Sequence, residues 1–312
     1  MENLMVAFQA VTPMCLMIGV GCLVRYGKMM DESAVRQANS MAYRIFMGLL
    51  MFYNIYTADL GVAMNGRLVG FCCVGLMIEF AVGMWIVRKM EKRPGSQGVM
   101  LLSFIRTNSA LIGVALATSV FGEGNIGEIT ILVSVVVPLS NVLSVVAFET
   151  VRGGQIHPGK LVMGILKNPL ILGVLLALVL VIPGIRLPGV AESTIHSIAS
   201  ASSPLVQVLL GASLDFSRFR LKDRNVVFCL IMRLLVFPAV FVSLGMAMGF
   251  RGVPLMGIML IFGCPMAANS FTMAVEMDGD TDLAGELVLL TTALSCVTLF
   301  GWIFLLKTLG MF

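Results

Sequence analysis

Two asparagines stand in apolar stretches of this chain, 161 positions apart, and each lies beside another residue that can do chemistry. The first stretch reads FIRTNSALIG and carries Arg106 and Asn108, and the second reads FGCPMAANSF and carries Pro265 and Asn269. Proline removes a backbone donor and breaks a helix, and polar side chains at bilayer depth are costly without partners. Paired interruptions in corresponding places of two halves indicate a substrate site near the middle of a membrane.

The asparagines and the arginine each have two interpretations. Asn108 and Asn269 either hydrogen-bond a neighbouring helix or contact a substrate beside the helix breaks, where half-helix N-termini attract carboxylates or phosphates. Arg106 either forms a salt bridge with Glu79 or binds an anionic substrate group through both arms of its guanidinium. The two roles of Arg106 are compatible, because a carboxylate partner can be exchanged for a substrate.

Glu79 is the acid nearest the centre of any apolar stretch. Because a medium of low dielectric disfavours the charged form of a carboxylate, Glu79 is a candidate for proton coupling. The alternative is a structural ion pair with Arg106 or Arg44. Arg44 and Arg233 each lie roughly two turns from one end of a stretch, so we expect both to snorkel outward and to be structural.

The composition predicts an all-α integral membrane protein in contact with the lipid bilayer. Of the 312 residues, 58% are hydrophobic and 12% are charged, and the mean hydropathy is +0.98. A soluble domain carries roughly a quarter charged residues. The formal net charge of +4 comes from basic residues clustered between apolar runs, which suits membrane orientation and gives no reason to expect a nucleic-acid partner.

Metal and cofactor chemistry has little support in the sequence. The seven cysteines lie in apolar stretches without a CxxC pair, and the two histidines are His157 and His196. The acidic loop that starts at Asp278 fails the EF-hand pattern, with Leu283 at position six and Leu289 at position twelve. We therefore expect no cofactor, no metal site and no enzyme, and we interpret the acidic loop as a solvated turn that caps the last helix.

Ten stretches have the length that a membrane-spanning helix needs. Of the 21 lysines and arginines, 14 lie in alternate loops, 4 in the opposite loops and 3 within stretches. This bias predicts a multi-pass protein of the cell inner (plasma) membrane with both termini outside, and a first helix that is retained instead of cleaved as a signal peptide. The stretches are 5–24, 38–57, 68–87, 98–121, 129–149, 169–184, 197–214, 227–248, 254–275 and 287–307.

The two halves of the chain contain matching landmarks. Pro13 opens PMCLMIGVGCLV and Pro169 opens PLILGVLLALVL, an offset of 156 that is close to the spacing of the two asparagines. Because five spans per half is an odd number, the second half must insert upside down. The sequence thus predicts inverted five-helix repeats over residues 1–155 and 156–312.

Motifs along nearly the whole chain resemble the auxin efflux carrier family. That resemblance implies ten transmembrane helices as two inverted five-helix repeats, with interrupted helices 4 and 9 crossing at their breaks. It also implies a scaffold of helices 1, 2, 6 and 7, which forms a homodimer, and a mobile transport bundle of helices 3–5 and 8–10. The matching pieces are RTNSALIG from Arg106, Phe121-Gly122, Pro138, Asn141, NPLI from Asn168, SPL from Ser203, LGASL from Leu210, PMAAN from Pro265 and LTTALS from Leu290.

The asparagine beside each crossover is the substrate-contact position of that family, which corresponds to Asn108 and Asn269. One departure is that family members commonly carry Gly-x-Pro in helix 4, whereas this chain has Gly113-Val114-Ala115. The break in helix 4 must then come from local packing, Gly113 and the polar residues, or else be less complete than in helix 9. The full set of substrate-binding candidates is Arg106, Asn108, Ser109, Asn141, Pro265 and Asn269.

The sequence therefore predicts a secondary active or facilitative transporter of a small organic anion, a mono- or dicarboxylate, that works by alternating access. Proton or sodium coupling is left open. The alternatives are a membrane-embedded enzyme, which usually needs a second acidic cluster facing the first, and an anion channel, which needs a continuous polar pore. Neither feature is visible in the sequence.

Overall fold

The computed structural model describes the chain except for residues 1, 58–64, 123–125, 153–162, 164–165 and 215–222. The described residues form helices and a single isolated bridge between two extended residues, so the all-α prediction is confirmed for them. The predicted boundary between the halves lies outside the described residues, as do His157, Lys160, Arg218, Arg220 and Lys222.

Each predicted apolar stretch is mainly helical where it is described, and three of the helices contain π-helical segments, labelled η. In the first half the elements are α1 (Glu2–Tyr26), α2 (Glu32–Met41), η1 (Ala42–Met47), α3 (Gly48–Tyr56), α4 (Gly66–Met90), α5 (Pro94–Ile105), η2 (Ser109–Gly113), α6 (Val114–Phe121) and α7 (Gly127–Arg152). In the second half they are α9 (Pro169–Val181), α10 (Gly189–Ser213), α11 (Arg224–Ile231), η5 (Met232–Val236), α12 (Phe237–Ala247), α13 (Gly252–Gly263), α14 (Asn269–Glu276) and α15 (Thr281–Thr308).

Among the described residues, five helices are long and apolar enough to cross a membrane, and four shorter apolar helices accompany them. The five cover Gly66–Met90, Gly127–Val151, Gly189–Ser213, Arg224–Ala247 and Thr281–Thr308. These lengths and compositions fit a multi-pass helical membrane protein. The count of ten spans and the inverted repeat stay predictions.

Polar residues mark where several helices begin, as their sequence positions suggest. Asn65 caps α4 by accepting from the Leu68 N–H at 3.1 Å, and Asp280 caps α15 by accepting from the Leu283 N–H at 3.1 Å. Such caps satisfy N–H groups that have no partner within the helix. The interpretation of the acidic loop as a capping turn is therefore confirmed at Asp280.

The turn between α4 and α5 is tied to the start of α11. Glu91 accepts hydrogen bonds from Arg93 Nε at 3.3 Å and from Asn225 Nδ2 at 2.6 Å. The hydrogen bond from Arg93 is the main reason why the pKa of the Glu91 carboxyl falls to about 2. This carboxylate therefore stays charged at neutral pH and fixes the end of α4 against α11.

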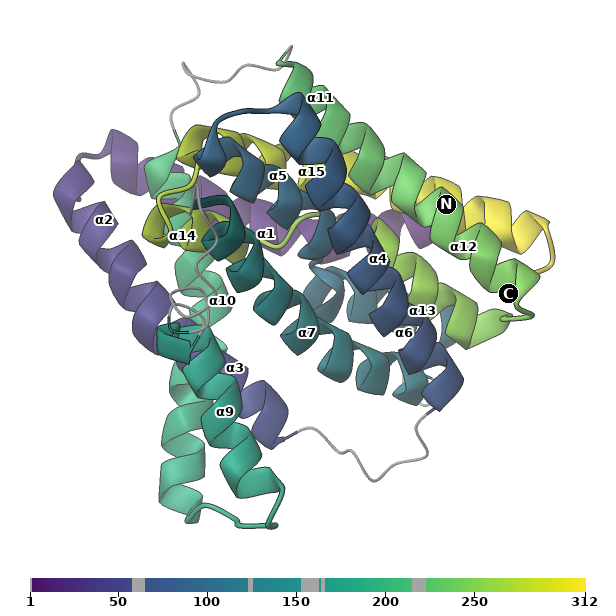
Figure 1. The fold of residues 1–312 in the computed structure, drawn as a ribbon, viewed down its shortest axis with the longest axis horizontal. Helices are drawn as coiled ribbons and strands as arrows, with labels where there is room; N and C mark the ends of the chain where they lie inside the picture. Colours follow the sequence, from purple (N-terminus) through teal and green to yellow (C-terminus); the bar gives the residue numbers. More distant parts are fainter. Residues whose placement is uncertain (1, 58–64, 123–125, 153–162, 164–165, 215–222) are drawn as a thin grey trace.

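Glycines bring two pairs of helices into close contact. A Cβ on Gly21 of α1 would lie 2.0 Å from the Val208 carbonyl oxygen of α10, and one on Gly173 of α9 would lie 2.2 Å from the Gly48 carbonyl oxygen of α3. Small residues allow such approach between membrane helices. Figure 1 shows α3 and α9 projecting together from one end of the molecule beside part of α10, while α4, α5, α7 and α13 lie in the larger body.

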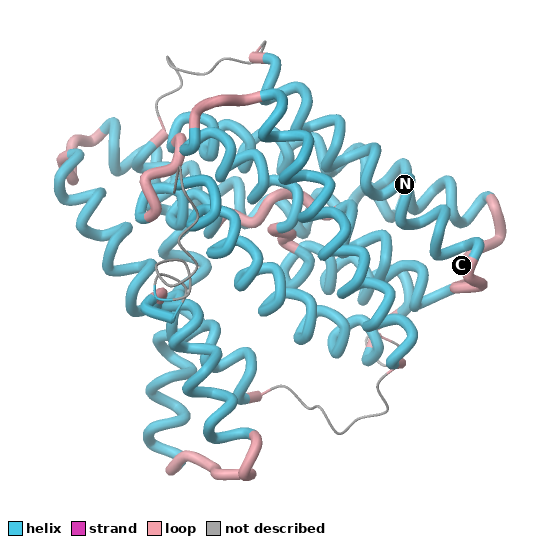
Figure 2. Tube along the Cα trace, in the orientation of Figure 1, coloured by secondary structure: helices cyan, strands magenta, loops and turns pink. Residues whose placement is uncertain are grey.

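The centre of that body consists of α5 and α13. All residues from Gly98 to Ile105 and from Leu255 to Gly263 are buried. Both helices are only 12 residues long, and each ends inside the protein instead of at its edge. Figure 2 shows loop segments inside the helical body as well as at its periphery. The interior ends of α5 and α13 are where the candidate site lies.

Replacing Gly21 tests the contact between α1 and α10. We expect Gly21→Ala to lower the melting temperature of the purified protein, because overpacking typically costs about 1–3 kcal/mol. Gly19→Ala is the matched control on the same helix, since a Cβ there has open space within 4 Å. Equal melting temperatures for the two variants, measured by thermal unfolding in detergent, would contradict the close contact.

Candidate functional site

The two interrupted stretches cross each other at their breaks. The Asn108 N–H donates to the Pro265 carbonyl oxygen at 2.9 Å, and the Ala267 N–H donates to the Arg106 carbonyl oxygen at 3.3 Å. Thr107 and Met266 form an antiparallel bridge between these bonds. Backbone groups that leave a helix inside a membrane protein need such internal partners. The prediction that both stretches are interrupted is confirmed, and they contact each other directly.

The break in the first stretch is complete although it lacks a proline. α5 ends at Ile105, Arg106 has an extended backbone with φ −94° and ψ 110°, and helical geometry resumes at Ser109. A Cβ on Gly113 would lie 3.3 Å from Cys264 Sγ and 3.4 Å from Leu260 Cβ, so the glycine lets η2 approach the second stretch closely. Of the two explanations offered by the sequence, local packing with Gly113 is the one that holds.

Arg106 is buried at the crossing and is bonded to neutral atoms. It is 2% exposed, and its Nη2 donates to Asn269 Oδ1 at 2.7 Å while its Nη1 lies 3.0 Å from Met273 Sδ. Among the described residues no acidic side chain comes within ion-pair distance of it, so the predicted salt bridge with Glu79 is wrong. A buried guanidinium is costly inside a membrane protein unless it is paired or solvated.

Glu79 faces Arg233 instead of Arg106. Arg233 Nη1 lies 3.8 Å from Glu79 Oε1, and both side chains are fully buried. The prediction that Arg233 snorkels outward is therefore wrong. Its guanidinium turns inward because the carbonyl groups at the ends of α5 and α13 accept its hydrogen bonds. Arg44 does snorkel as expected, with a side chain that is 68% exposed.

The other candidates differ in how they take part. Ser109 is fully buried at the start of η2, and its Oγ has no hydrogen-bond partner among the described residues. Pro265 contributes its carbonyl group to the crossing, as described above. Asn141 lies on α7, which packs against η2, and its Nδ2 donates to the Val137 carbonyl oxygen at 2.8 Å. The structure thus gathers Arg106, Asn108, Ser109, Pro265 and Asn269 at one crossing.

Comparison with known proteins agrees with this architecture. A family model described as a membrane transport protein matches residues 6–303. The chain belongs to this family of membrane transporters. The resemblance to the auxin efflux carriers is thereby confirmed.

Two archaeal relatives cover almost the whole transporter. An uncharacterized transporter of Methanothermobacter thermautotrophicus is 21% identical over 297 residues, which is 94% of this chain and 96% of that protein. An uncharacterized transporter of Methanocaldococcus jannaschii is 23% identical over 318 residues, which is 96% of this chain and 100% of that protein. Because the family and these relatives are named for transport, they favour a transporter over an enzyme.

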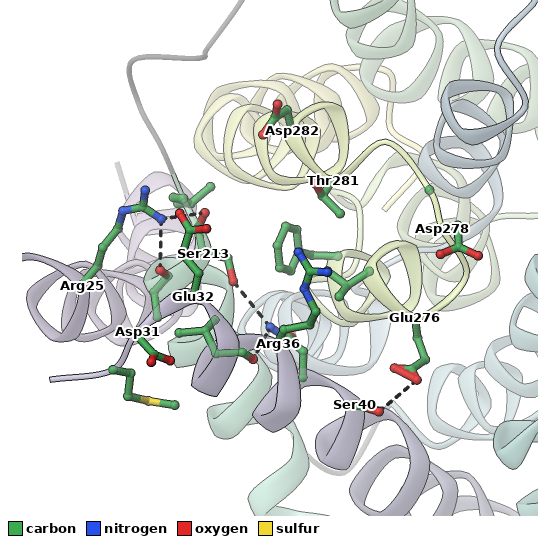
Figure 3. Close-up of a pocket in the computed structure, with 18 of the residues that line it drawn as sticks. Arg25, Asp31, Glu32, Arg36, Ser40, Ser213, Glu276, Asp278, Thr281 and Asp282 are labelled. Atoms are coloured by element: carbon green, nitrogen blue, oxygen red, sulfur yellow. Dashed lines mark hydrogen bonds between the residues drawn. The ribbon is translucent and has the colours of Figure 1, made fainter. Parts of the chain in front are cut away.

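A cavity of about 1060 Å³ lies between the α1–α2 region and α14 of this transporter (Figure 3). Its wall includes charged side chains from the α1–α2 region and from α14 and the turn that follows it, among them Arg25, Arg36 and Glu276. Arg106 and Asn269 do not line it. The buried Asn39 does line it, and Asn39 Oδ1 accepts from Thr272 Oγ1 of α14 at 3.2 Å. The first turn of α14 therefore separates the cavity from Asn269.

A second cavity of about 400 Å³ lies near the end of α14, with Glu276 and Met277 in its wall. Tyr43 and Asn168 line it, and the Tyr43 hydroxyl oxygen accepts from Asn168 Nδ2 at 2.8 Å. Tyr43 is 2% exposed. Sequence reasoning missed Tyr43, Asn39 and Thr272. The available signal was the spacing of Asn39 and Tyr43, which places two polar groups one helical turn apart in an apolar stretch.

Glu276 of α14 lines both cavities and contacts α2 and η1. It accepts hydrogen bonds from Ser40 Oγ at 3.0 Å and from Arg44 Nη2 at 2.8 Å. Arg44 is mostly exposed, so this ion pair is screened by solvent and is worth at most about 1 kcal/mol. The contact can therefore open and close without a large change in free energy.

A double-mutant cycle with Arg44→Met and Glu276→Gln measures this contact. We expect a coupling free energy of at most about 1 kcal/mol in denaturant unfolding of the purified protein, and a smaller value at high salt. A coupling of more than about 2 kcal/mol that persists in high salt would show that the contact is a fixed part of the fold.

Proposed function

We propose that this transporter carries a small organic anion, a mono- or dicarboxylate, which binds at the crossing of the two interrupted stretches. The observation that carries the proposal is the state of Arg106, a buried guanidinium whose nearest polar partners are the neutral Asn269 and Met273. A buried cation without an acidic partner is expensive inside a membrane, and a bound carboxylate offsets that cost.

The helix end beside Arg106 adds to the positive potential. Asn269 is the first residue of α14, and a helix N-terminus presents N–H groups and a partial positive charge. Asn269 Oδ1 holds the guanidinium, so its amide Nδ2 is available to donate to a carboxylate oxygen. Ser109, whose buried hydroxyl has no partner within the described part of the chain, supplies a further group of this kind. Together they provide the donors that an organic acid needs.

The mechanism that we propose is alternating access in a homodimer in the plasma membrane, with both termini outside. Ten membrane helices in two inverted repeats would form a scaffold (helices 1, 2, 6 and 7) and a moving bundle (helices 3–5 and 8–10). Two features support this division: the glycine contacts that pair α1 with α10 and α3 with α9, and the hydrogen bonds between α2 and α14. The glycine contacts are close enough to keep a scaffold together, whereas the hydrogen bonds between α2 and α14 are few enough to break during transport.

Uptake into proteoliposomes tests the function directly. We expect saturable uptake of at least one of labelled malonate, malate or an aromatic acid, and counterflow when the vesicles are preloaded with the same acid. Conductance without saturation would indicate a channel. Chemical conversion of the acid without flux would indicate an enzyme, and either outcome would refute the carrier.

Substitution at the crossing tests the site. We expect Arg106→Ala and Asn269→Ala each to abolish uptake, because each removes a donor or its support, while the protein keeps its elution profile in size-exclusion chromatography. Arg88→Ala at the exposed end of α4 is the matched control and should transport normally. Normal uptake of the acid by both crossing variants would place the substrate elsewhere.

Glu79 is our candidate for coupling transport to protons, with sodium as the other coupling ion left open by the sequence. Both of its carboxylate oxygens are buried and have no hydrogen-bond partner among the described residues, and Arg233 is its charged neighbour. Since glutamine imitates the protonated side chain, we expect Glu79→Gln to flatten the pH dependence of uptake. A pH profile identical to that of the unmodified transporter would remove Glu79 from coupling.

A further inference from the structure

Two helix C-termini meet at the crossing. α5 ends at Ile105 and α13 ends at Gly263, and both ends are buried. The last carbonyl groups of a helix lack partners within it, and the macrodipole places a partial negative charge there. In secondary transporters with interrupted helices, such half-helix ends and unwound carbonyls coordinate the coupling cation. The crossing therefore needs positive charge at this point.

Arg233 supplies hydrogen-bond donors to both ends. Its Nε donates to the Cys264 carbonyl oxygen at 2.8 Å, its Nη2 to the Ile261 carbonyl oxygen at 3.3 Å, and its Nη1 to the Phe104 carbonyl oxygen. Phe104 belongs to the last turn of α5, and Ile261 and Cys264 belong to the end of α13. A planar guanidinium with donors on three nitrogens can link three acceptors in this way, whereas a lysine ammonium lacks the rigid fork.

The pairing with Glu79 does not explain this arrangement. Glu79 Oε1 is 3.8 Å from Arg233 Nη1, and neither oxygen of Glu79 has a hydrogen-bond partner among the described residues. If Arg233 served chiefly as the counter-ion of Glu79, its donors would bond the carboxylate. They bond the backbone carbonyls instead, so the carbonyls determine where the guanidinium lies.

The helix that carries Arg233 departs from α-helical geometry at this residue. Arg233 lies in η5, a π-helical segment between α11 and α12, and the side chain is fully buried. A π-helical turn changes the direction of the side chains within it and is common at functional sites. The α11–η5–α12 helix thus delivers one guanidinium to the place where the two other helices end.

We propose that Arg233 is a positioning residue that acts as a built-in cation: its guanidinium occupies the space between the two half-helix C-termini where a coupling sodium ion would bind. This inference rests on the proposed transport function in one respect: it narrows the choice of coupling ion by arguing against sodium. Arg233 holds the carbonyl ends of α5 and α13 together, while Arg106, which bonds Asn269 and not these carbonyls, is left for the substrate. The crossing then requires no sodium ion for its stability.

Thermal unfolding of the full-length protein in lipid nanodiscs tests the proposal without any substrate. We expect Arg233→Met to lower the melting temperature by several degrees, and the double variant Glu79→Gln with Arg233→Met to remain low, because the carbonyls stay unpaired in both. Glu79→Gln alone should lower the melting temperature less than Arg233→Lys does. If the double variant regains the original melting temperature, Arg233 serves only to neutralise Glu79 and the proposal is wrong.

Chemical rescue provides the second arm. We expect millimolar guanidinium to raise the melting temperature of Arg233→Ala, whereas choline at equal ionic strength does not, and replacing sodium by choline should leave the unmodified protein unchanged. Stabilisation of the unmodified protein by sodium would overturn the proposal, as would equal effects of guanidinium and choline. If Arg233→Ala fails to fold, the melting temperatures of Glu79→Gln and Arg233→Lys provide the test. An Arg233→Lys variant as stable as the unmodified protein would refute the role of Arg233 in bonding the three carbonyls.

Discussion

A backbone that leaves its helix inside a membrane protein must find new partners for its N–H and C=O groups, and this constraint shapes the crossing. Residues on either side of Thr107 and Met266 satisfy each other through an antiparallel pair of hydrogen bonds. Arg233 donates to three further carbonyls at the two helix ends, those of Phe104, Ile261 and Cys264. Each break is tolerated because the other break lies against it, which explains why the first one needs no proline.

The two buried arginines at the crossing have different surroundings. Arg233 lies among three carbonyl oxygens with Glu79 nearby, so its charge is balanced. Arg106 lies against the neutral Asn269 and Met273, so within the described residues its charge is balanced by dipoles alone. Because an isolated charge at this depth is unfavourable, the unbalanced arginine is the one whose surroundings a bound carboxylate would improve. The proposed selectivity for anions follows from this difference.

The sequence predicted the helices and the breaks well, because apolar runs and polar interruptions are local signals. It placed Arg106, Asn108 and Asn269 at breaks that the structure brings into contact. It failed on partners, assigning Glu79 to Arg106 or Arg44 and sending Arg233 outward. Position along a span indicates depth in the membrane but not the direction in which a side chain points, and the π-helical turn at Arg233 has no simple sequence signature. Pairing between helices therefore had to come from the structure.

The proposed substrate site at Arg106 is buried, so access to it requires movement. Asn39, which is hydrogen-bonded to Thr272 on α14, lines the larger cavity, and Tyr43 lines the smaller one. Glu276 lies in the wall of both, held by a solvent-screened ion pair. The short half-helix α14, which begins at Asn269, thus contributes to the walls of both cavities through Glu276, whereas the close glycine contacts between α1 and α10 do not involve it. In the proposed mechanism, a small shift of α14 relative to α2 would break the contacts between these two helices and displace Asn269, the proposed substrate contact, in the same step, which would link access to binding.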